Sequence, residues 1–226
     1  MKLIPFLTGL LFIVAASNPA LAAGSPHEFS PASATAEDGR VVIRFAGAIS
    51  IGDANAITEL HDLIAKQIKV RGPIQDYKEP WLVMNSKGGS VTEAMAIGRW
   101  LRRVKGTAVL PFESECFSSC VYVLAGGSRR MVYGSVGIHR PFLVRPSNED
   151  YGMAMQSVLA KSRQYFFEMG VPEKLADDMF GVEPEQNRIL SEPMLSQYRL
   201  NQMDIGLKEE LSIEEASRLG VSRQEY

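Results

Sequence analysis

The sequence lacks any block of like charge, and this absence bears on its partners. Its 226 residues carry 24 Lys and Arg against 26 Asp and Glu, a formal net charge of −2. Proteins that bind DNA or RNA through the phosphates present a basic patch. We therefore expect no nucleic-acid partner. A mean hydropathy close to zero also argues against a polytopic membrane protein.

Cysteine is scarce as well, because Cys116 and Cys120 are the only two. With no histidine beside them, we expect no metal site there. Within one helix, side chains four residues apart have Cβ atoms about 5 to 6 Å apart, which is too far for a disulfide. A Cys116–Cys120 bridge therefore requires Cys116 to lie in the turn before a helix. Two buried free thiols are the alternative.

An apolar run stands at the N-terminus of the chain. Lys2 precedes apolar residues 3–16, and small residues lead up to Ala22. The run is shorter than the roughly 20 residues of a membrane-spanning helix. A signal peptide over 1–22, cleaved near Ala22/Ala23, is favoured over a membrane anchor. We therefore expect export across the inner membrane to the periplasm.

The remainder divides into a lead-in and one domain. Residues 23–38 are rich in Ser, Pro and Ala, which is typical of a flexible segment. Residues 39–226 contain enough apolar material for one sizeable core. No internal repeat is present, and the phosphate-loop pattern Gly-x-x-x-x-Gly-Lys-Ser/Thr is absent. We expect no cofactor.

Strand patterns alternate with helix patterns along this domain. Apolar runs predict strands at residues 41–45, 81–84, 107–110, 131–133 and 136–138. Helical spacing predicts helices at residues 54–70, 91–105, 118–125, 149–169 and 172–180, with a last helix opening at a capping box, Ser212 to Glu215. Residues 112–117 are interpreted as a turn. This alternation predicts an α/β layered fold with a largely parallel sheet.

Residues 85–91, Asn-Ser-Lys-Gly-Gly-Ser-Val, join a predicted strand to a predicted helix. Gly88 and Gly89 permit a tight turn whose N–H groups point outward, with a helix N-terminus behind them. Such a site favours an anion, either a phosphate or the oxyanion of a reaction intermediate. A plain turn is the alternative.

Ser118 and His139 stand at two further junctions. A serine at a helix start is usually an N-cap, but a nucleophile gains there from the N–H of the next residue. His139 follows a predicted strand, where it either transfers a proton or serves a structural role. His27 and His61 carry little weight, because they fall in the lead-in and on a helix.

Two stretches carry a resemblance to a known family. "NSKGGSVTEAMAIGRWLR" and "CFSSCVYVLAGGSRRMVYGSVGIHRP" resemble the proteolytic subunit of Clp protease, within a match over roughly residues 41–206. The Cys-x-Ser-x-Cys variation makes the chain most similar to exported ClpP-like proteins of the ClpP/crotonase superfamily. The resemblance implies repeated β-β-α units, with a largely parallel sheet flanked by helices.

The resemblance also implies a role for each motif residue. Ser118 would be the nucleophile and His139 its base, with Gly88, Gly89 and the Ser119 amide forming the oxyanion hole. Ser119 is the alternative nucleophile. If both serines were helical, their side chains would point about 100° apart and could not meet the same histidine.

The third member of the triad departs from the family. Asn187 stands where the family has Asp, and its carbonyl could hold the His139 ring without stabilising its charge. Asp177 or Asp178 could take its place. Lys87 replaces the family's Pro and adds a cation near the oxyanion site.

These assignments predict an exported serine peptidase-like hydrolase. Asn187 favours the alternative, a weak or inactive ClpP-fold protein used for binding or assembly. A peptide or unfolded protein is the expected substrate, and a homo-oligomer is expected because the family forms rings. A periplasm has no ATP supply, so we expect no ATP-driven unfoldase. A coenzyme A substrate is not expected outside the cytoplasm.

Overall fold

A five-stranded sheet forms the centre of the computed structural model, which describes residues 32–71, 78–142 and 148–219. Its strand order is β1-β2-β3-β4-β6. The bounds are β1 (Ser33–Glu37), β2 (Arg40–Ala46), β3 (Lys78–Asn85), β4 (Thr107–Leu110) and β6 (Arg129–Val132). The pairs β2–β3, β3–β4 and β4–β6 are parallel, and β1 is antiparallel to β2.

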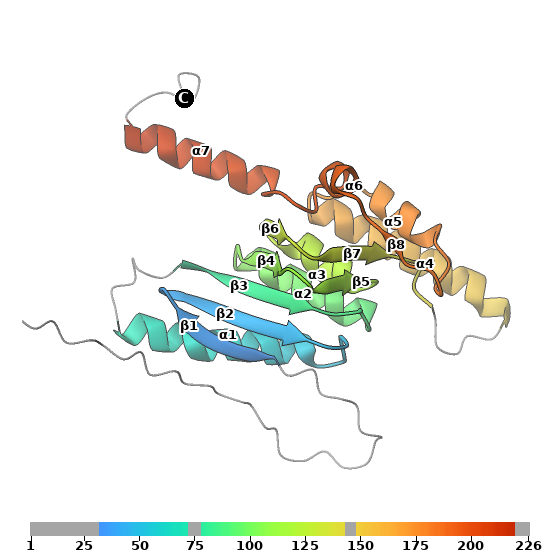
Figure 1. Cartoon of the computed structure of the whole chain (residues 1–226), viewed down its shortest axis with the longest axis horizontal. Helices are drawn as coiled ribbons and strands as arrows, with labels where there is room; N and C mark the ends of the chain where they lie inside the picture. Colours follow the sequence, from blue (N-terminus) through green and yellow to red (C-terminus); the bar gives the residue numbers. More distant parts are fainter. Residues whose placement is uncertain (1–31, 72–77, 143–147, 220–226) are drawn as a thin grey trace, which may run out of the picture.

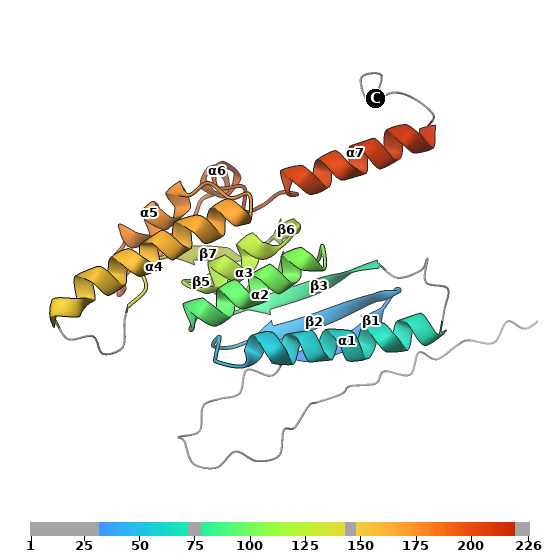
Figure 2. The same ribbon diagram turned by 180° about the vertical axis from the view of Figure 1, so that it is seen from behind.

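The helices follow the strands in the alternation that the sequence predicts. They are α1 (Asp53–Arg71), α2 (Val91–Arg103), α3 (Cys120–Gly126), α4 (Asn148–Glu168), α5 (Lys174–Phe180), α6 (Glu192–Gln197) and α7 (Ile205–Leu219). Figure 1 shows α7 reaching away from the sheet, and Figure 2 shows α1 and α2 in front of the strands. The fold is thus mixed α/β, with parallel strands flanked by helices.

Two glycines allow α2 and α3 to pack closely. A Cβ atom on Gly126 would lie 2.3 Å from the Cα of Gly98. Every residue of α3 is buried, which explains why the sequence there is a continuous apolar run. The helix that follows Ser118 is therefore fixed within the core.

A second, smaller sheet has the order β5-β7-β8. Its strands are β5 (Glu115–Phe117), β7 (Ser135–Ile138) and β8 (Arg188–Ile189). β5 is parallel to β7, and β8 is antiparallel to it. The interpretation of residues 112–117 as a turn is therefore wrong at β5, which is too short to show a strand period.

The C-terminal end of the predicted flexible lead-in, residues 23–38, is a strand instead, because β1 forms there. Asp38 and Gly39 connect β1 to β2 with φ of 48° and 75°, and Glu37 pairs with Arg40. An Asp-Gly turn with both φ positive is a preferred two-residue hairpin connection. The predicted signal peptide, residues 1–22, lies outside the described residues.

The last helix begins earlier than predicted. Asp204 caps it, because its Oδ1 accepts the N–H groups of Gly206 and Leu207 at 2.9 and 3.3 Å. Ser212 lies inside α7, where its hydroxyl donates to the Lys208 carbonyl. The expected capping box at Ser212 is therefore wrong.

Over the described ranges, no helix has both the length and the apolar character needed to cross a bilayer.

Candidate active site

The loop after β3 is joined to β5 by hydrogen bonds. The Ser86 N–H donates to the Glu115 carbonyl at 2.8 Å, and the Phe117 N–H donates to the Ser86 carbonyl at 3.0 Å. The Asn85 side chain accepts the Glu115 N–H at 3.1 Å. Asn85 and Ser86 therefore hold the glycine turn beside the strand that leads into Ser118.

The Gly88–Gly89 turn is fixed on its other side by Ile49. The Ile49 N–H donates to the Gly88 carbonyl at 2.9 Å, and the Ser90 N–H donates to the Ile49 carbonyl at 2.8 Å. In a trans peptide the carbonyl and the following N–H point in opposite directions, so the Gly89 N–H points away from Ile49. The Gly88 N–H donates to Ser86 Oγ at 3.1 Å. Of the two glycine amides, Gly89 is thus the better donor to an oxyanion.

Gly88 lies against the predicted nucleophile. A Cβ atom on Gly88 would lie 2.8 Å from Ser118 Cβ and 3.0 Å from the Ser119 nitrogen. The backbone φ of Gly88 is +99°, a conformation that residues with side chains rarely adopt. The turn therefore requires glycine here for its backbone shape and for its approach to Ser118.

Ser118 occupies a strained turn between β5 and α3. Its φ is +55°, its N–H donates to the Gly137 carbonyl at 3.0 Å, and its carbonyl accepts the Val121 N–H at 3.1 Å. Strained backbone of this kind clusters at active sites. A serine on a sharp strand-to-helix turn is also how α/β-hydrolases present their nucleophile.

The helix start differs from the sequence-based expectation at both serines. α3 begins at Cys120, so Ser118 is neither helical nor the N-cap, and the expected 100° separation does not apply. Ser119 holds the N-cap position, where its N–H has no intrahelical acceptor. Ser118 is half-buried, whereas Ser119 is only 1% exposed, and its Oγ has no partner among the described residues. Ser118 is thus the more accessible hydroxyl.

The two cysteines enclose this turn. Cys116 lies in β5 and Cys120 is the first residue of α3, so Cys116 is off the helix, as a bridge requires. The structure links them by a disulfide with their Cα atoms 5.2 Å apart. Both residues are fully buried. The bridge therefore ties the strand before Ser118 to the helix after it.

His139 follows β7, next to the strand that leads into Ser118. Phe117 pairs with Gly137 in the parallel register, so Ser118 and His139 leave the same end of neighbouring strands. The His139 side chain is buried, and its Nδ1 lies 3.0 Å from the Arg140 carbonyl oxygen. A carbonyl only accepts, so Nδ1 carries the proton, and in the neutral ring Nε2 is the basic nitrogen.

Asn187 directly precedes β8 but does not hold the His139 ring. The antiparallel pairing of β7 with β8 ends at Ile138 and Arg188, the residues next to His139 and Asn187. Asn187 is exposed, and within the described residues the Nδ1 proton goes to the Arg140 carbonyl instead. The structure therefore does not support Asn187 as the residue that orients His139.

Asp177 and Asp178, the alternatives to Asn187, bond to residues other than His139. Asp177 accepts from Arg163 at 2.7 Å. Asp178 accepts from Lys174 and from the Tyr198 hydroxyl. Burial of the Asp178 carboxylate opposes its charged form, but these two hydrogen bonds, together with the charges of Lys174 and Arg188, lower its pKa. Neither aspartate takes the place of the family's triad residue in this structure.

The charge near the glycine turn is partly balanced. The Lys87 ammonium lies 3.6 Å from a Glu115 carboxylate oxygen, and the Lys87 side chain is well exposed. Its attraction for an oxyanion is therefore reduced by the neighbouring carboxylate and by solvent. Among the described residues, no cluster of three or more His, Cys, Asp or Glu could hold a metal ion.

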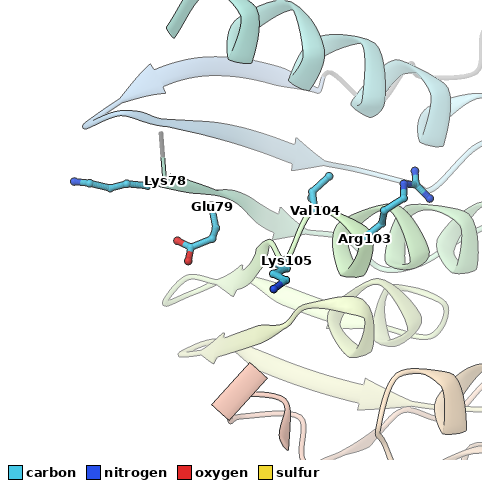
Figure 3. A pocket seen from close by; sticks show the side chains of 5 residues that line it. All are labelled: Lys78, Glu79, Arg103, Val104 and Lys105. Carbon is cyan, nitrogen blue, oxygen red and sulfur yellow. The ribbon is translucent and has the colours of Figure 1, made fainter. Parts of the chain in front are cut away.

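A shallow depression lies at the other end of β3. It has a volume of about 480 Å³, and Lys78, Glu79, Arg103, Val104 and Lys105 line it (Figure 3). Lys78 and Glu79 open β3, whereas the glycine turn follows the end of that strand. The depression is therefore not part of the Ser118 site.

Comparisons with known proteins support the fold. Neither a family model nor a curated protein matches the chain. Among solved structures, the chain matches a mutant of the 1510-N membrane-bound stomatin-specific protease at 16% identity, with a TM-score of 0.52. The match covers 76% of this chain and 81% of that one. At this identity the likeness shows the fold alone, which confirms the predicted α/β arrangement and relates it to the fold of a protease.

Proposed function

We propose that this chain is a serine peptidase-like hydrolase, with Ser118 as nucleophile and His139 as its base. The observation that carries the proposal is the strained Ser118 turn, at φ +55°, held against the Gly88–Gly89 turn. A positive φ is unfavourable for a serine, so the surrounding contacts must hold this residue in place. The fold shared with a protease supports this interpretation.

The chemistry follows from the positions of the donors. His139 Nε2 takes the proton as Ser118 Oγ attacks a carbonyl carbon, and the ring then gives that proton to the leaving group. The amides of Gly89 and Ser119 donate to the oxyanion of the tetrahedral intermediate. The same ring then deprotonates a water that attacks the acyl carbon, and it returns the proton to Ser118 Oγ as the ester bond breaks. Each step uses groups from the two turns and the end of β7.

A slow enzyme is expected from the groups around His139. The Arg140 carbonyl fixes the Nδ1–H tautomer of His139, but it carries no full charge to stabilise the imidazolium that forms as Ser118 loses its proton. The oxyanion hole and substrate binding alone still leave roughly 10³ to 10⁴ over the reaction in water. We therefore expect acylation to be easier to detect than sustained turnover.

The experiment is active-site labelling of the purified protein with a fluorophosphonate, followed by mapping of the adduct by mass spectrometry. Labelling at Ser118 should disappear in Ser118→Ala, fall in His139→Ala and persist in Ser119→Ala. An adduct on Ser119, or none on any serine of the folded protein, refutes the assignment.

An inactive binding or assembly protein of the same fold is the second candidate. It is favoured by one observation, that among the described residues the His139 Nδ1 bonds to a backbone carbonyl rather than to a carboxylate. Complete absence of labelling, with the protein folded, would select this candidate.

The cellular setting is proposed from the sequence. The pattern over residues 1–22 supports export to the periplasm. There the hydrolase would act on peptides or unfolded chains without an ATP-driven unfoldase, and as a homo-oligomer. Fractionation of cells would test the location, and sizing of the mature protein by light scattering would test the oligomer.

A further inference from the structure

The Arg140 carbonyl can orient His139 only if Arg140 is itself held in place. The Arg140 N–H donates to the Val182 carbonyl at 2.9 Å. The Arg140 guanidinium lies 2.5 Å from a Glu183 carboxylate oxygen. Val182 thus holds the backbone of Arg140, and the next residue, Glu183, holds the Arg140 side chain. Pro141 follows and restricts the backbone of Arg140 further.

We infer that Glu183 is a positioning residue for the Ser118–His139 site. By holding Arg140, it fixes the carbonyl that accepts the Nδ1 proton of His139, so that the ring presents Nε2 to Ser118. Within the described residues Arg140 Nε is buried and unpaired, and the guanidinium is held by its ion pair with Glu183. The effect on catalysis rests on the proposed function, whereas the effect on the ring proton does not.

The exposure of the ion pair separates a positioning role from a stabilising one. The Glu183 side chain is 55% exposed and that of Arg140 is 35% exposed. Exposed pairs contribute little to the free energy of unfolding. Loss of Glu183 should therefore leave the fold intact while it loosens the peptide beside His139, where small displacements have large effects on rate.

The direct test is the position of the ring proton, read by ¹⁵N NMR of the full-length protein at a pH where His139 is neutral. Absence of its signals in His139→Ala assigns the ring. In the wild type, Nδ1 should carry the proton. Glu183→Ala should give a mixture of the two tautomers, and Glu183→Gln, which keeps an acceptor oxygen for Arg140, should restore the wild-type pattern.

Activity gives a second readout with matched controls. Glu183→Ala should slow fluorophosphonate labelling of Ser118 about 10- to 100-fold, the scale expected for a small misplacement of the base. Glu185→Ala, which removes a neighbouring exposed carboxylate, and Asn187→Ala should change neither the labelling rate nor the tautomer. Arg140→Gln, which removes the ion pair from its other side, should reproduce Glu183→Ala.

Two results would overturn the inference. One is a wild-type ring protonated on Nε2. The other is a tautomer that responds to Asn187→Ala but not to Glu183→Ala or Arg140→Gln. If fluorophosphonate fails to label Ser118 while the ring proton behaves as expected, the hydrolase proposal fails and the role of Glu183 in orienting His139 stands.

Discussion

Gly88→Ala tests the contact that brings the two motifs together. Alanine at φ +99° carries a backbone cost of about 1 to 3 kcal/mol. Its Cβ would also lie 2.8 Å from both the Phe117 carbonyl oxygen and Ser118 Cβ, where ordinary contacts begin at 3.4 Å. The backbone at Ser118 must therefore move by a few tenths of an ångström or more.

Gly52→Ala is the matched control. Gly52 has φ of +100°, and a Cβ atom there would meet nothing within 4 Å. Alanine at Gly52 therefore incurs the same backbone cost of about 1 to 3 kcal/mol without touching Ser118. The difference between the two variants isolates the contact, for which overpacking adds roughly 1 to 3 kcal/mol at Gly88.

The assay pairs urea unfolding with the rate of fluorophosphonate labelling, measured where both variants are folded. Gly52→Ala should label within about twofold of wild type. Gly88→Ala should label about 30- to 100-fold more slowly, because a displacement near 1 Å costs about 10² in rate. Equal labelling rates in the two variants would refute the argument that Gly88 positions Ser118.

Two further changes test the surroundings of the site. Replacing Cys116 and Cys120 together with Ser should lower the free energy of unfolding by about 2 kcal/mol and slow labelling of Ser118 about tenfold or more; alkylation of either Cys in native, unreduced protein would contradict the disulfide. Asp204→Asn should cost about 1 to 3 kcal/mol at pH 7, because Asp204 pairs with Arg102 at 2.7 Å. Burial opposes the Asp204 charge, but the hydrogen bond and charge of Arg102 outweigh burial and lower its pKa. The contribution of this pair to the free energy of unfolding is present above the unfolded pKa of about 3.9 and is lost as the pH falls through the lower folded pKa. If urea unfolding at pH 2 still shows a lower free energy of unfolding for Asp204→Asn than for wild type, the argument is contradicted.

The strands and helices of the central layers could be predicted from the sequence, because their apolar patterns are strong and local. β4 was predicted at its observed bounds, Thr107–Leu110, and α2 was found from one apolar face. The β1–β2 hairpin was missed although its Asp38–Gly39 turn is a strong signal. Residues 33–37, Ser-Ala-Thr-Ala-Glu, contain few strand-forming side chains, so only pairing with β2 makes them a strand.

The details of the Ser118 turn depend on contacts between distant segments. A positive φ at a serine has no local signature, and helix propensity in the following apolar run favoured a helix that includes Ser118. The conformation is fixed by the Gly137 carbonyl, the Cys116–Cys120 bridge and the close approach of Gly88. The motifs identified which residues meet, and the tertiary contacts determined how they meet.

Asn187 and the Arg140 carbonyl are competing acceptors for the Nδ1 proton of His139. This competition explains why the family's triad position, occupied here by Asn187, did not predict the acceptor. Ordering an exposed Asn187 side chain costs on the order of 1 kcal/mol in lost rotamers. Arg140, in contrast, is already held through its N–H by the Val182 carbonyl and through its guanidinium by Glu183. Both acceptors are neutral and of about equal strength, so the acceptor that is already ordered is favoured. A carboxylate at position 187 would add a charge-assisted hydrogen bond, about twice as strong as a neutral one, and could reverse that order. On this argument Asn187→Asp should move the Nδ1 proton of His139 from the Arg140 carbonyl to the new carboxylate and raise the rate of Ser118 labelling. A downfield shift of the Nδ1 proton in ¹H NMR would report the stronger bond, and a labelling rate unchanged in Asn187→Asp would show that the fixed carbonyl holds the ring against a charged competitor.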